Sequence, residues 1–364
     1  MTDIRLNQLR DWCHTQLAQL EQLEQPHDAA NPAPLEAVSG DASFRRYFRV
    51  RGDGWHYIAV DAPPQNENSA PFIHIAKLFA TAGVHTPAVI ATDAKAGFML
   101  LEDLGDALYL PALLACQTEA NHDEASTLYQ QAIDALLRIQ TGVPGESLNP
   151  YSREELRSEL ELFPEWFCHA LLKVTPNKSE RRMLDEVFTF LEDAALAQPQ
   201  VAVHRDYHSR NLFLPVADTG MPGIIDFQDA VTGAYTYDLV SLLRDCYIRW
   251  DESLMWHWAE YYFKQATALK IVPPARATEF RRDFDLMGLQ RHLKVLGIFA
   301  RLHIRDNKPD YLADMPLVMN YFLDVARRHA LSQPPQPQLQ ALLSWFEETL
   351  LPATHPHFKH LTEN

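Results

Sequence analysis

The chain has 364 residues, of which 47% are hydrophobic, 22% charged and 10% aromatic. Such a composition is that of an ordinary globular protein, large enough to fold into two lobes. The formal net charge of −16 argues against nonspecific binding to nucleic acid, which requires a basic surface. We expect a cytoplasmic protein, because residues 1–5 lack the layout of a signal peptide and no segment approaches the roughly 20 apolar residues that span a membrane.

The first hundred residues predict a small sheet with helices. Leucines at approximately helical spacing between Leu6 and Leu23 indicate an amphipathic helix, which the proline-bearing residues 26–34 should end. Residues 69–82, followed by Gly83, predict a second helix. Alternating and apolar runs predict five strands, at residues 35–38, 44–50, 55–61, 88–91 and 98–102.

From residue 107 onward leucine-rich helical segments dominate, with one interruption that carries chemistry. Residues 204–211 read His-Arg-Asp-Tyr-His-Ser-Arg-Asn, and Asp226 follows the apolar run Gly-Ile-Ile. Short apolar stretches at residues 199–203, 212–214 and 223–225 predict strands that give this loop a hairpin-like scaffold. An isolated His-x-Asp is more often a turn capped by an aspartate, but here the spacing and the strands occur together.

Phosphoryl transfer requires these residue types at this spacing. A carboxylate must accept the proton of the acceptor hydroxyl, and oxygen ligands must hold magnesium against the phosphates. Asp206 suits the first role, and Asn211 and Asp226 suit the second. We expect His204 to lock the loop by hydrogen bonding to the loop's backbone. Asp238, near the start of a helix, should act as a brace for that helix or the loop. The four cysteines lack CxxC spacing and predict free thiols.

The pattern His-x-Asp-x4-Asn followed by Ile-Asp-Phe resembles the aminoglycoside phosphotransferase-like small-molecule kinases. Residues 39–50, 60–64, 101–106 and 290–297 resemble more narrowly the bacterial N-acetylmuramate/N-acetylglucosamine anomeric kinases of cell-wall recycling. The resemblance implies an α+β, two-lobed protein-kinase-like fold. Its small ATP-binding lobe, with the N-terminal helix, would cover residues 1–103 and hold a five-stranded antiparallel sheet with one helix. Its mainly helical large lobe would cover residues 104–364, with the catalytic loop, the metal site and the sugar pocket. It also implies ATP and Mg²⁺ as cofactors.

The same resemblance assigns nucleotide contacts in the small lobe. Backbone N–H groups of the turn between the first two strands would approach the phosphates, and a hinge after the fifth strand would face the adenine. The candidate residues are Ser39, Gly40, Asp41, Ser43, Arg45, Arg46, Leu101, Glu102, Asp103 and Leu104. A plain β-turn and the end of a buried strand are the alternatives. Asp61 stands where related kinases carry a phosphate-binding lysine, and Arg45 or Arg46 would substitute for it.

The acceptor pocket should be formed by large-lobe helices. Gln290, Lys294, Gly297 and Arg301 share one helical face, and Lys294 or Arg301 would suit the lactyl carboxylate of N-acetylmuramate. A solvated face or an internal salt-bridge network is the alternative. The further candidates for substrate binding are Arg205, Asp229, Arg244 and Arg249.

Three functions remain in competition at this stage. The first is an ATP-dependent sugar kinase acting on the anomeric C1 hydroxyl of N-acetylmuramate and N-acetylglucosamine. The second is another kinase of the superfamily, acting on an aminoglycoside, choline or homoserine. The third is a catalytically silent nucleotide-binding module, which only the absent lysine suggests and which the joint presence of Asp206, Asn211 and Asp226 argues against. The expected partners are a small sugar and ATP, without nucleic acid or membrane, and the oligomeric state is left open.

Overall fold

A computed structural model describes residues 3–21, 34–38, 44–52, 54–215, 220–331 and 336–358. The chain divides into two compact units. Unit 1 comprises residues 1–107 and 213–229, and unit 2 comprises residues 108–212 and 230–364. A single boundary after residue 103 does not describe this division, because the chain returns to unit 1 after the catalytic loop.

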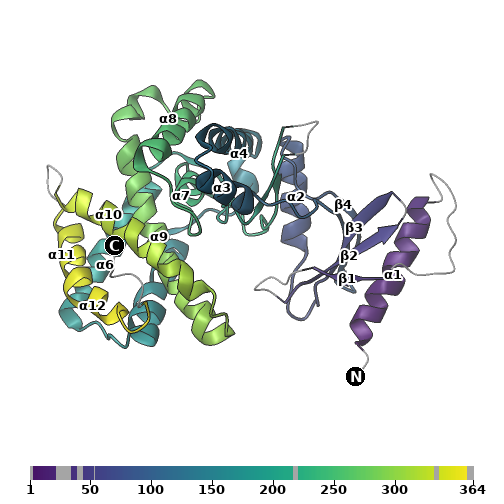
Figure 1. The fold of residues 1–364 in the computed structure, drawn as a ribbon, viewed down its shortest axis with the longest axis horizontal. Coiled ribbons are helices and arrows are strands. Elements are labelled where there is room, and N and C mark those ends of the chain that lie inside the picture. The colour runs from purple at the N-terminus through teal and green to yellow at the C-terminus, as the bar shows by residue number, and fades with distance from the viewer. Residues whose placement is uncertain are drawn as a thin grey trace. The chain divides into compact units, whose positions relative to one another are not determined.

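Unit 1 is built on a five-stranded antiparallel sheet (Figure 1). The strand order is β1-β2-β3-β5-β4, and the ladder between β2 and β3 runs from Arg46 opposite Asp61 to Gly52 opposite Trp55. The strands are β1 (Glu36–Ala37), β2 (Arg46–Gly52), β3 (Trp55–Asp61), β4 (Val89–Asp93) and β5 (Phe98–Glu102). The five expected strands are confirmed, and the first is shorter than predicted.

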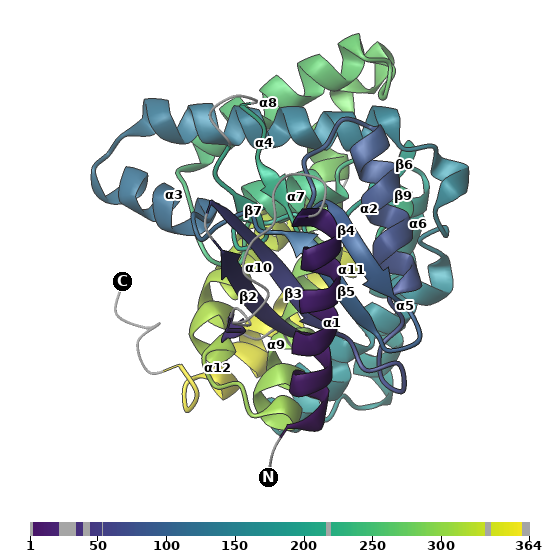
Figure 2. The ribbon, with the colours of Figure 1, turned by 90° about the vertical axis from the view of Figure 1, so that its right-hand side faces the viewer.

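Two helices accompany this sheet, α1 (Ile4–Glu21) and α2 (Ala70–Thr81). Figures 1 and 2 show them on opposite faces of the sheet. The apolar side of α1 packs on β2, β3 and β5 through Leu9, Cys13 and Leu17, which are buried. The leucine spacing therefore reports burial of one helix face, as predicted.

Two short strands precede Asp226 in the chain. β7 (Leu212–Phe213) pairs with β8 (Gly223–Ile224), while β6 (Gln200–Val203), before the catalytic loop, pairs with β9 (Val231–Ala234). The three expected strands are confirmed as β6, β7 and β8, but the pairing of β6 with β9 is not what the sequence predicts. β9 has only four residues, two of them Thr232 and Gly233, and too little apolar alternation to be recognised from sequence.

Unit 2 is mainly helical, and its long helix α9 (Phe280–Asp306) contributes to an extensive hydrophobic cluster. The other helices are α3 (Tyr109–Thr118), α4 (His122–Gly142), α5 (Arg153–Leu160), α6 (Lys178–Leu196), α7 (Tyr237–Leu243), α8 (Glu252–Ala268), α10 (Tyr311–Ala330), α11 (Pro337–Trp345) and α12 (Leu351–Thr354). Shorter 3-10 turns cover Gly145–Ser147 and Pro274–Thr278, and π-helical turns cover Phe163–Leu171 and Phe346–Leu350. The π-helical turn at Phe163–Leu171 lies against α9, where a Cβ on Gly297 would come within 2.4 Å of the backbone of Leu162.

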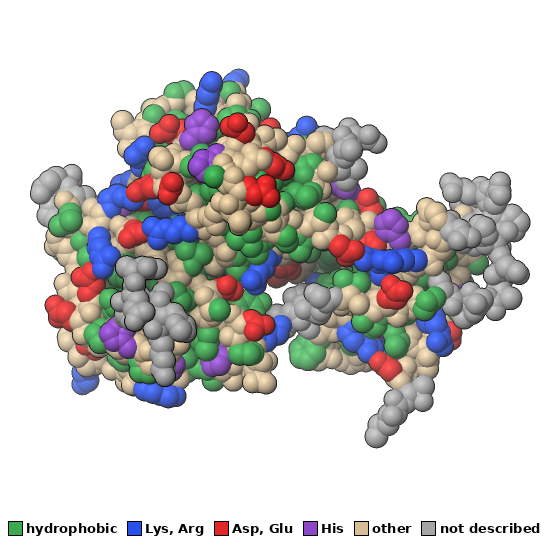
Figure 3. Space-filling model, viewed as in Figure 1, with side chains coloured by type: hydrophobic (Ala, Val, Ile, Leu, Met, Phe, Trp, Pro, Cys, Tyr) green, Lys and Arg blue, Asp and Glu red, His purple; other side chains and the backbone are tan. Residues whose placement is uncertain are grey.

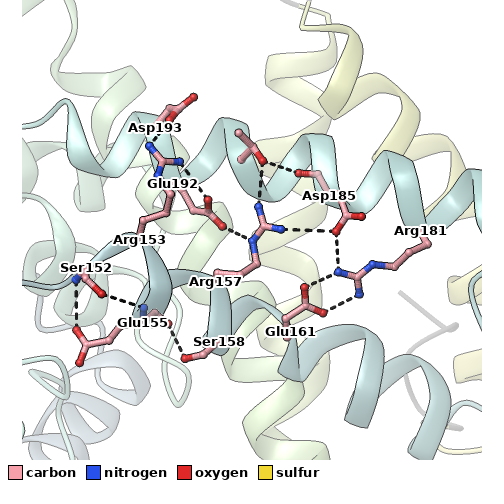
Figure 4. Close-up of polar contacts among 11 residues, drawn as sticks. Ser152, Arg153, Glu155, Arg157, Ser158, Glu161, Arg181, Asp185, Glu192 and Asp193 are labelled. Atoms are coloured by element: carbon pink, nitrogen blue, oxygen red, sulfur yellow. Dashed lines mark hydrogen bonds and ion pairs between the residues drawn. The ribbon is translucent and has the colours of Figure 1, made fainter.

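An arginine network fixes α5 on α6 (Figure 4). Arg157 contacts Glu192 and Asp185, and Arg153 contacts Glu192 and, at 2.6 Å, Asp193. Because Glu192 is buried, both arginines compensate a carboxylate that is removed from water. This anchoring sets the position of α5, which carries Glu159 toward the catalytic loop.

Within the described part of the chain, no helix is long and apolar enough to cross a membrane. Figure 3 shows acidic and basic side chains interspersed over the visible face of unit 2 rather than gathered into one basic patch.

Candidate active site

The catalytic loop begins where β6 ends, and Asp238 of α7 holds its backbone. The carboxylate of Asp238 accepts hydrogen bonds from the N–H of His204 at 2.6 Å and of Arg205 at 3.0 Å. Nδ1 of His204 in turn accepts the N–H of Asp206 at 3.2 Å. Burial raises the pKa of Asp238 to about 7, and the two N–H donors act in the opposite direction. The expected roles of Asp238 as a brace and of His204 as a lock are confirmed.

Replacing Asp238 with alanine should destabilise unit 2. The change leaves the N–H groups of His204 and Arg205 without their acceptor in a buried place, at a cost of about 1–3 kcal/mol for each group. We expect the free energy of unfolding, measured by urea denaturation, to fall by about 2–4 kcal/mol. Asp238→Asn keeps one acceptor oxygen for these N–H groups, so its free energy of unfolding should fall less. Wild-type stability of Asp238→Ala would show that Asp238 does not hold the loop.

The loop then turns back so that Asn211 meets Asp206. Nδ2 of Asn211 donates to the carbonyl of Asp206 at 2.9 Å, and the N–H of Asn211 donates to the carbonyl of His208 at 2.9 Å. Burial lowers the pKa of His208 to about 3, so its imidazole is neutral at physiological pH. Because the amide nitrogen of Asn211 points to Asp206, its oxygen Oδ1 is turned toward the other side.

Cations surround the carboxylate of Asp206. Burial acts to raise the pKa of Asp206, but the charges of Lys294 and Arg291 outweigh it and hold the pKa below its usual value. Arg291 is buried and donates to the carbonyl of Arg205 at 3.1 Å. Asp206 is therefore ionised at neutral pH and able to accept a hydrogen bond from an alcohol.

Glu159 of α5 balances these cations, and sequence reasoning missed it. Its carboxylate contacts Arg205, lies 2.8 Å from Nζ of Lys294 and accepts the hydroxyl of Tyr151. Lys294 also donates to the hydroxyl of Tyr237 at 2.9 Å. The signal in the sequence is weak, since Glu159 is one acid among several on α5 and only its place between the apolar Leu156 and Leu160 indicates burial.

Arg205 has a backbone conformation that L-residues rarely adopt, with φ of 79°. Its N–H is held by Asp238, its carbonyl by Arg291 and its guanidinium by Glu159. A strained residue persists where its surroundings determine it this fully. The guanidinium of Arg205 thus contacts a buried carboxylate, and the predicted role of Arg205 in substrate binding stays a prediction.

Asp226 belongs to unit 1, where the short strand β8 delivers it. The N–H of Ile224 donates to the carbonyl of His85 at 2.8 Å, and a Cβ on Gly223 would lie 2.8 Å from Leu104. Next to Asp226, the buried ring of Phe227 packs 4.8 Å from that of Phe72 on α2. Asp226 has φ of 66° and accepts a hydrogen bond from Nε2 of Gln228 at 2.8 Å. Backbone strain of this kind, at a residue two positions beyond the end of β8, is typical of functional sites.

The predicted metal ligands offer the kind of donor atom that magnesium prefers. Asn211 and Asp226 offer oxygen atoms, and the described residues contain no cluster of three or more histidine, cysteine or acidic side chains suited to a metal. Magnesium is held in kinases by one or two carboxylates together with substrate phosphates and water, so a dense cluster of protein ligands is not required.

In unit 1, the arginines expected to contact phosphates are ion-paired. Arg46 contacts Asp61 and Asp3, and Arg45 lies 3.3 Å from Glu67. Asp61 is buried and also bound by Arg5, so the position usual for a lysine is an internal ion-pair centre. Substitution of the lysine by Arg45 or Arg46 stays a proposal. Ser39, Gly40, Asp41 and Ser43 lie outside the described residues.

The predicted hinge residues end the strand β5 and begin the loop after it. Leu101 is buried and pairs with Ile58, and Glu102 contacts His85 at 3.1 Å. Asp103 binds Arg49 of β2 and accepts the N–H of Gly105 at 2.9 Å. The segment is therefore the end of a buried strand, as in the alternative given from the sequence, and it continues into a loop whose backbone is held in place.

The candidates for substrate binding are dispersed over both units. Arg244 is buried against Asp285, Arg249 pairs with Asp324 at 2.7 Å, and Asp229 is exposed in unit 1. The face of α9 that carries Gln290, Lys294 and Arg301 is largely internal rather than a solvated outer face, since Gln290 and Lys294 are buried. Arg301 is half-buried, and burial lowers its pKa.

These features define a phosphotransferase. The sequence model of the phosphotransferase enzyme family matches residues 34–287, and the chain belongs to this family. An N-acetylmuramate/N-acetylglucosamine kinase from Pseudomonas putida is 43% identical over 326 residues, which cover 90% of this chain and 93% of the relative.

Solved structures share the fold. An ethanolamine kinase from Plasmodium vivax matches with a TM-score of 0.59 and 12% identity, covering 85% of this chain and 87% of the other. The ADP-bound aminoglycoside phosphotransferase APH(2'')-Ib matches with a TM-score of 0.51 and 11% identity, covering 84% and 97%. The expected α+β, protein-kinase-like fold is confirmed.

Proposed function

We propose that this chain is an ATP-dependent sugar kinase that phosphorylates the anomeric C1 hydroxyl of N-acetylmuramate and N-acetylglucosamine in the recycling of cell-wall sugars. The observation that carries this proposal is the 43% identity to a kinase of that name across nine-tenths of the chain. The cytoplasm, where ATP is supplied, is the expected location.

Asp206 accepts the proton of the C1 hydroxyl as that oxygen attacks the γ-phosphorus of ATP. An ionised carboxylate held beside Lys294 and Arg291 is a weak base, which suits a reaction whose transition state is loose and whose nucleophile loses its proton late. The contribution of this chain is therefore mainly orientation of the hydroxyl, with the loop fixed by Asp238, Arg291 and Glu159.

Asn211 and Asp226 would hold Mg²⁺, which when bound neutralises the charge on the transferring phosphates. The support for this assignment is their oxygen donors, their sequence spacing and the strained conformation of Asp226.

Arg210 is a better candidate than Lys294 for the lactyl carboxylate of N-acetylmuramate. Lys294 is buried and engaged by Glu159 and Tyr237. Arg210 lies in the catalytic loop beside Asn211, and 43% of its side chain is exposed. Its guanidinium stacks 3.5 Å from the ring centre of Tyr247 and lies 3.6 Å from Asp314. A stacked guanidinium with only a long ion-pair contact retains donors for an incoming carboxylate.

Arg210→Gln should therefore discriminate between the two sugars. A charge-assisted hydrogen bond contributes about 1.5–3 kcal/mol, so kcat/KM for N-acetylmuramate should fall by about ten- to a hundredfold. N-acetylglucosamine has no carboxylate and should be affected much less. Arg301→Gln removes the other cation that the sequence indicated for the carboxylate, a half-buried arginine of α9, and tests that alternative. Arg182→Gln, which removes an exposed arginine of α6, is the matched control. Equal losses on both sugars in Arg210→Gln, or a selective loss in Arg301→Gln alone, would place the carboxylate elsewhere.

A panel of acceptors tests the function itself. The purified protein is incubated with ATP and Mg²⁺ and with N-acetylmuramate, N-acetylglucosamine, choline, homoserine or an aminoglycoside, and release of ADP is measured. We expect turnover with the two amino sugars at rates far above those with the other acceptors. Preference for choline, homoserine or the aminoglycoside would contradict the proposal, and no turnover with any acceptor would favour a silent nucleotide-binding module.

A further inference from the structure

Asn211 is the last residue of a tight turn in the catalytic loop. The N–H of Asn211 donates to the carbonyl of His208 at 2.9 Å, so Ser209 and Arg210 are the two central residues of this turn. A side chain at the end of a turn keeps its position only if the central residues of the turn are held. The contacts of Ser209 and Arg210 therefore determine where the amide of Asn211 lies.

Asp245 holds the backbone of Ser209. Oδ2 of its carboxylate accepts the N–H of Ser209 at 2.9 Å, and Oδ1 accepts the N–H of Tyr247 at 3.1 Å. The carbonyl of Ser209 in turn accepts the N–H of Leu110 of α3 at 3.1 Å. Asp245 and Ser209 are both buried, so water does not compete for these bonds.

Tyr247 extends the same connection to the side chains of the turn. Its ring lies 5.3 Å from the ring of His208, and the guanidinium of Arg210 lies 3.5 Å from its centre. Because the N–H of Tyr247 is bonded to Asp245, one carboxylate acts on the turn in two ways. It binds one residue of the turn directly and fixes the backbone of the aromatic residue that contacts two others.

Asp238 and Asp245 hold different parts of the catalytic loop. The helix α7 is buried along its whole length. Asp238, in its first turn, accepts the two N–H groups at the start of the loop, before Asp206. Asp245, two residues beyond the end of α7, accepts an N–H between Asp206 and Asn211. The loop is therefore attached to this helix on both sides of the proposed proton acceptor.

The charge of Asp245 strengthens its bonds. Burial raises the pKa of Asp245 to about 6, and donation from Ser209 and Tyr247 acts in the opposite direction. The ionised form therefore predominates at neutral pH, and it binds N–H groups more strongly than a neutral acceptor does. Loss of this charge should loosen the turn even where the shape of the side chain is kept.

We propose that Asp245 is a positioning residue for Asn211, which fixes the turn from His208 to Asn211 so that the amide oxygen of Asn211 keeps the position of a metal ligand. The inference rests on the proposed role of Asn211 in holding Mg²⁺. It gives Asp245 no contact with the metal or with the sugar.

Binding of ADP at a series of Mg²⁺ concentrations, measured by calorimetry, tests this role without turnover. For wild-type protein the affinity should rise with Mg²⁺ and level off. Asp245→Asn keeps the shape of the side chain but loses the charge and one acceptor. It should need about fivefold or more Mg²⁺ to reach half of that rise, because a buried N–H loses its acceptor. Without Mg²⁺ it should bind ADP like wild type.

Asp283→Asn is the matched control. Asp283 is another buried carboxylate of unit 2, and it accepts hydrogen bonds from Arg276 at 2.7 Å and from Tyr235 at 3.0 Å rather than from the loop. This variant should be less stable than wild type, with an unchanged dependence of ADP binding on Mg²⁺.

Amide hydrogen exchange of the wild-type protein needs no variant, so it tests the proposal even if Asp245→Asn does not fold. The amide of Ser209 should be protected in the free protein, and ADP with Mg²⁺ should add little protection, since the turn is already held. An amide that is unprotected until ADP and Mg²⁺ are added would show that the metal orders the turn, and would overturn the proposal.

The proposal would also be overturned if Asp245→Asn had the Mg²⁺ dependence of wild type, or if Asp283→Asn shifted it equally. These results would leave the proposed kinase activity and its metal site intact. An ADP affinity of the wild-type protein that did not depend on Mg²⁺ would be a different failure, because it would remove the proposed metal site and this inference together.

Discussion

Asp206→Asn should lower kcat by about a hundredfold or more while ADP binding and stability stay close to wild type, because general-base contributions are of about this size. The amide has nearly the same shape as the carboxylate, and the bond from Asn211 goes to the backbone carbonyl of residue 206, which the substitution retains. Turnover is measured by coupled ADP release at saturating sugar.

The control for this change is Glu186→Gln, which removes an exposed carboxylate of α6 paired with Arg182 and should leave kcat unchanged. A folded Asp206→Asn protein with wild-type kcat would exclude Asp206 as the proton acceptor.

Asp226→Asn should cause a loss at least as large, and one tied to magnesium. Asparagine tolerates the left-handed backbone of this position, and its oxygen can still accept the bond from Gln228, so the fold should persist. The variant lacks the charge that a hard cation requires, and turnover at millimolar Mg²⁺ should fall by about a hundredfold or more.

Magnesium titration separates this role from a structural one. Asn211→Ala should raise the magnesium concentration at half-maximal rate, whereas Asp226→Asn should not recover at any concentration tested. Full activity of Asp226→Asn at ordinary magnesium would contradict the assignment of Asp226 as a metal ligand.

The elements that sequence predicted well are those whose burial follows a local period. The strand β5 has the predicted bounds, and α1 buries the side that carries Leu9 and Leu17. By contrast, β9 is set by its pairing with β6, and its four residues carry little pattern of their own. Which strand accompanies the catalytic loop is therefore a property of tertiary pairing.

The residues of the candidate site also fall into those that the local sequence indicates and those that only the fold reveals. Asp206, Asn211 and Asp226 could be chosen because spacing along one loop and one strand is local information. Glu159 and Arg291 could not be chosen from the sequence, because their partners lie far along the chain. Glu159 contacts Lys294 and Arg205, and Arg291 donates a hydrogen bond to the carbonyl of Arg205. A charged residue in an apolar helix indicates burial, but only the fold shows which partner compensates it.

The position of Asp61 shows how tertiary partners change the meaning of a residue. In the sequence, Asp61 stands where related kinases carry a phosphate-binding lysine. In unit 1 it is a buried acid contacted by Arg5 and Arg46, so α1 and β2 supply the charge that keeps this acid inside the lobe. Arg5 comes from 56 residues away and no local pattern links the two.

The site of phosphorylation on the sugar tests the central claim most directly. Purified protein is given ATP, Mg²⁺ and either N-acetylglucosamine or its methyl glycoside, in which the C1 oxygen is blocked, and the products are followed by phosphorus NMR. The account predicts a single sugar phosphate from the free sugar, with its phosphorus coupled to the anomeric proton, and no product from the glycoside. Phosphorylation of the glycoside, or a phosphate coupled to the C6 protons, would contradict it.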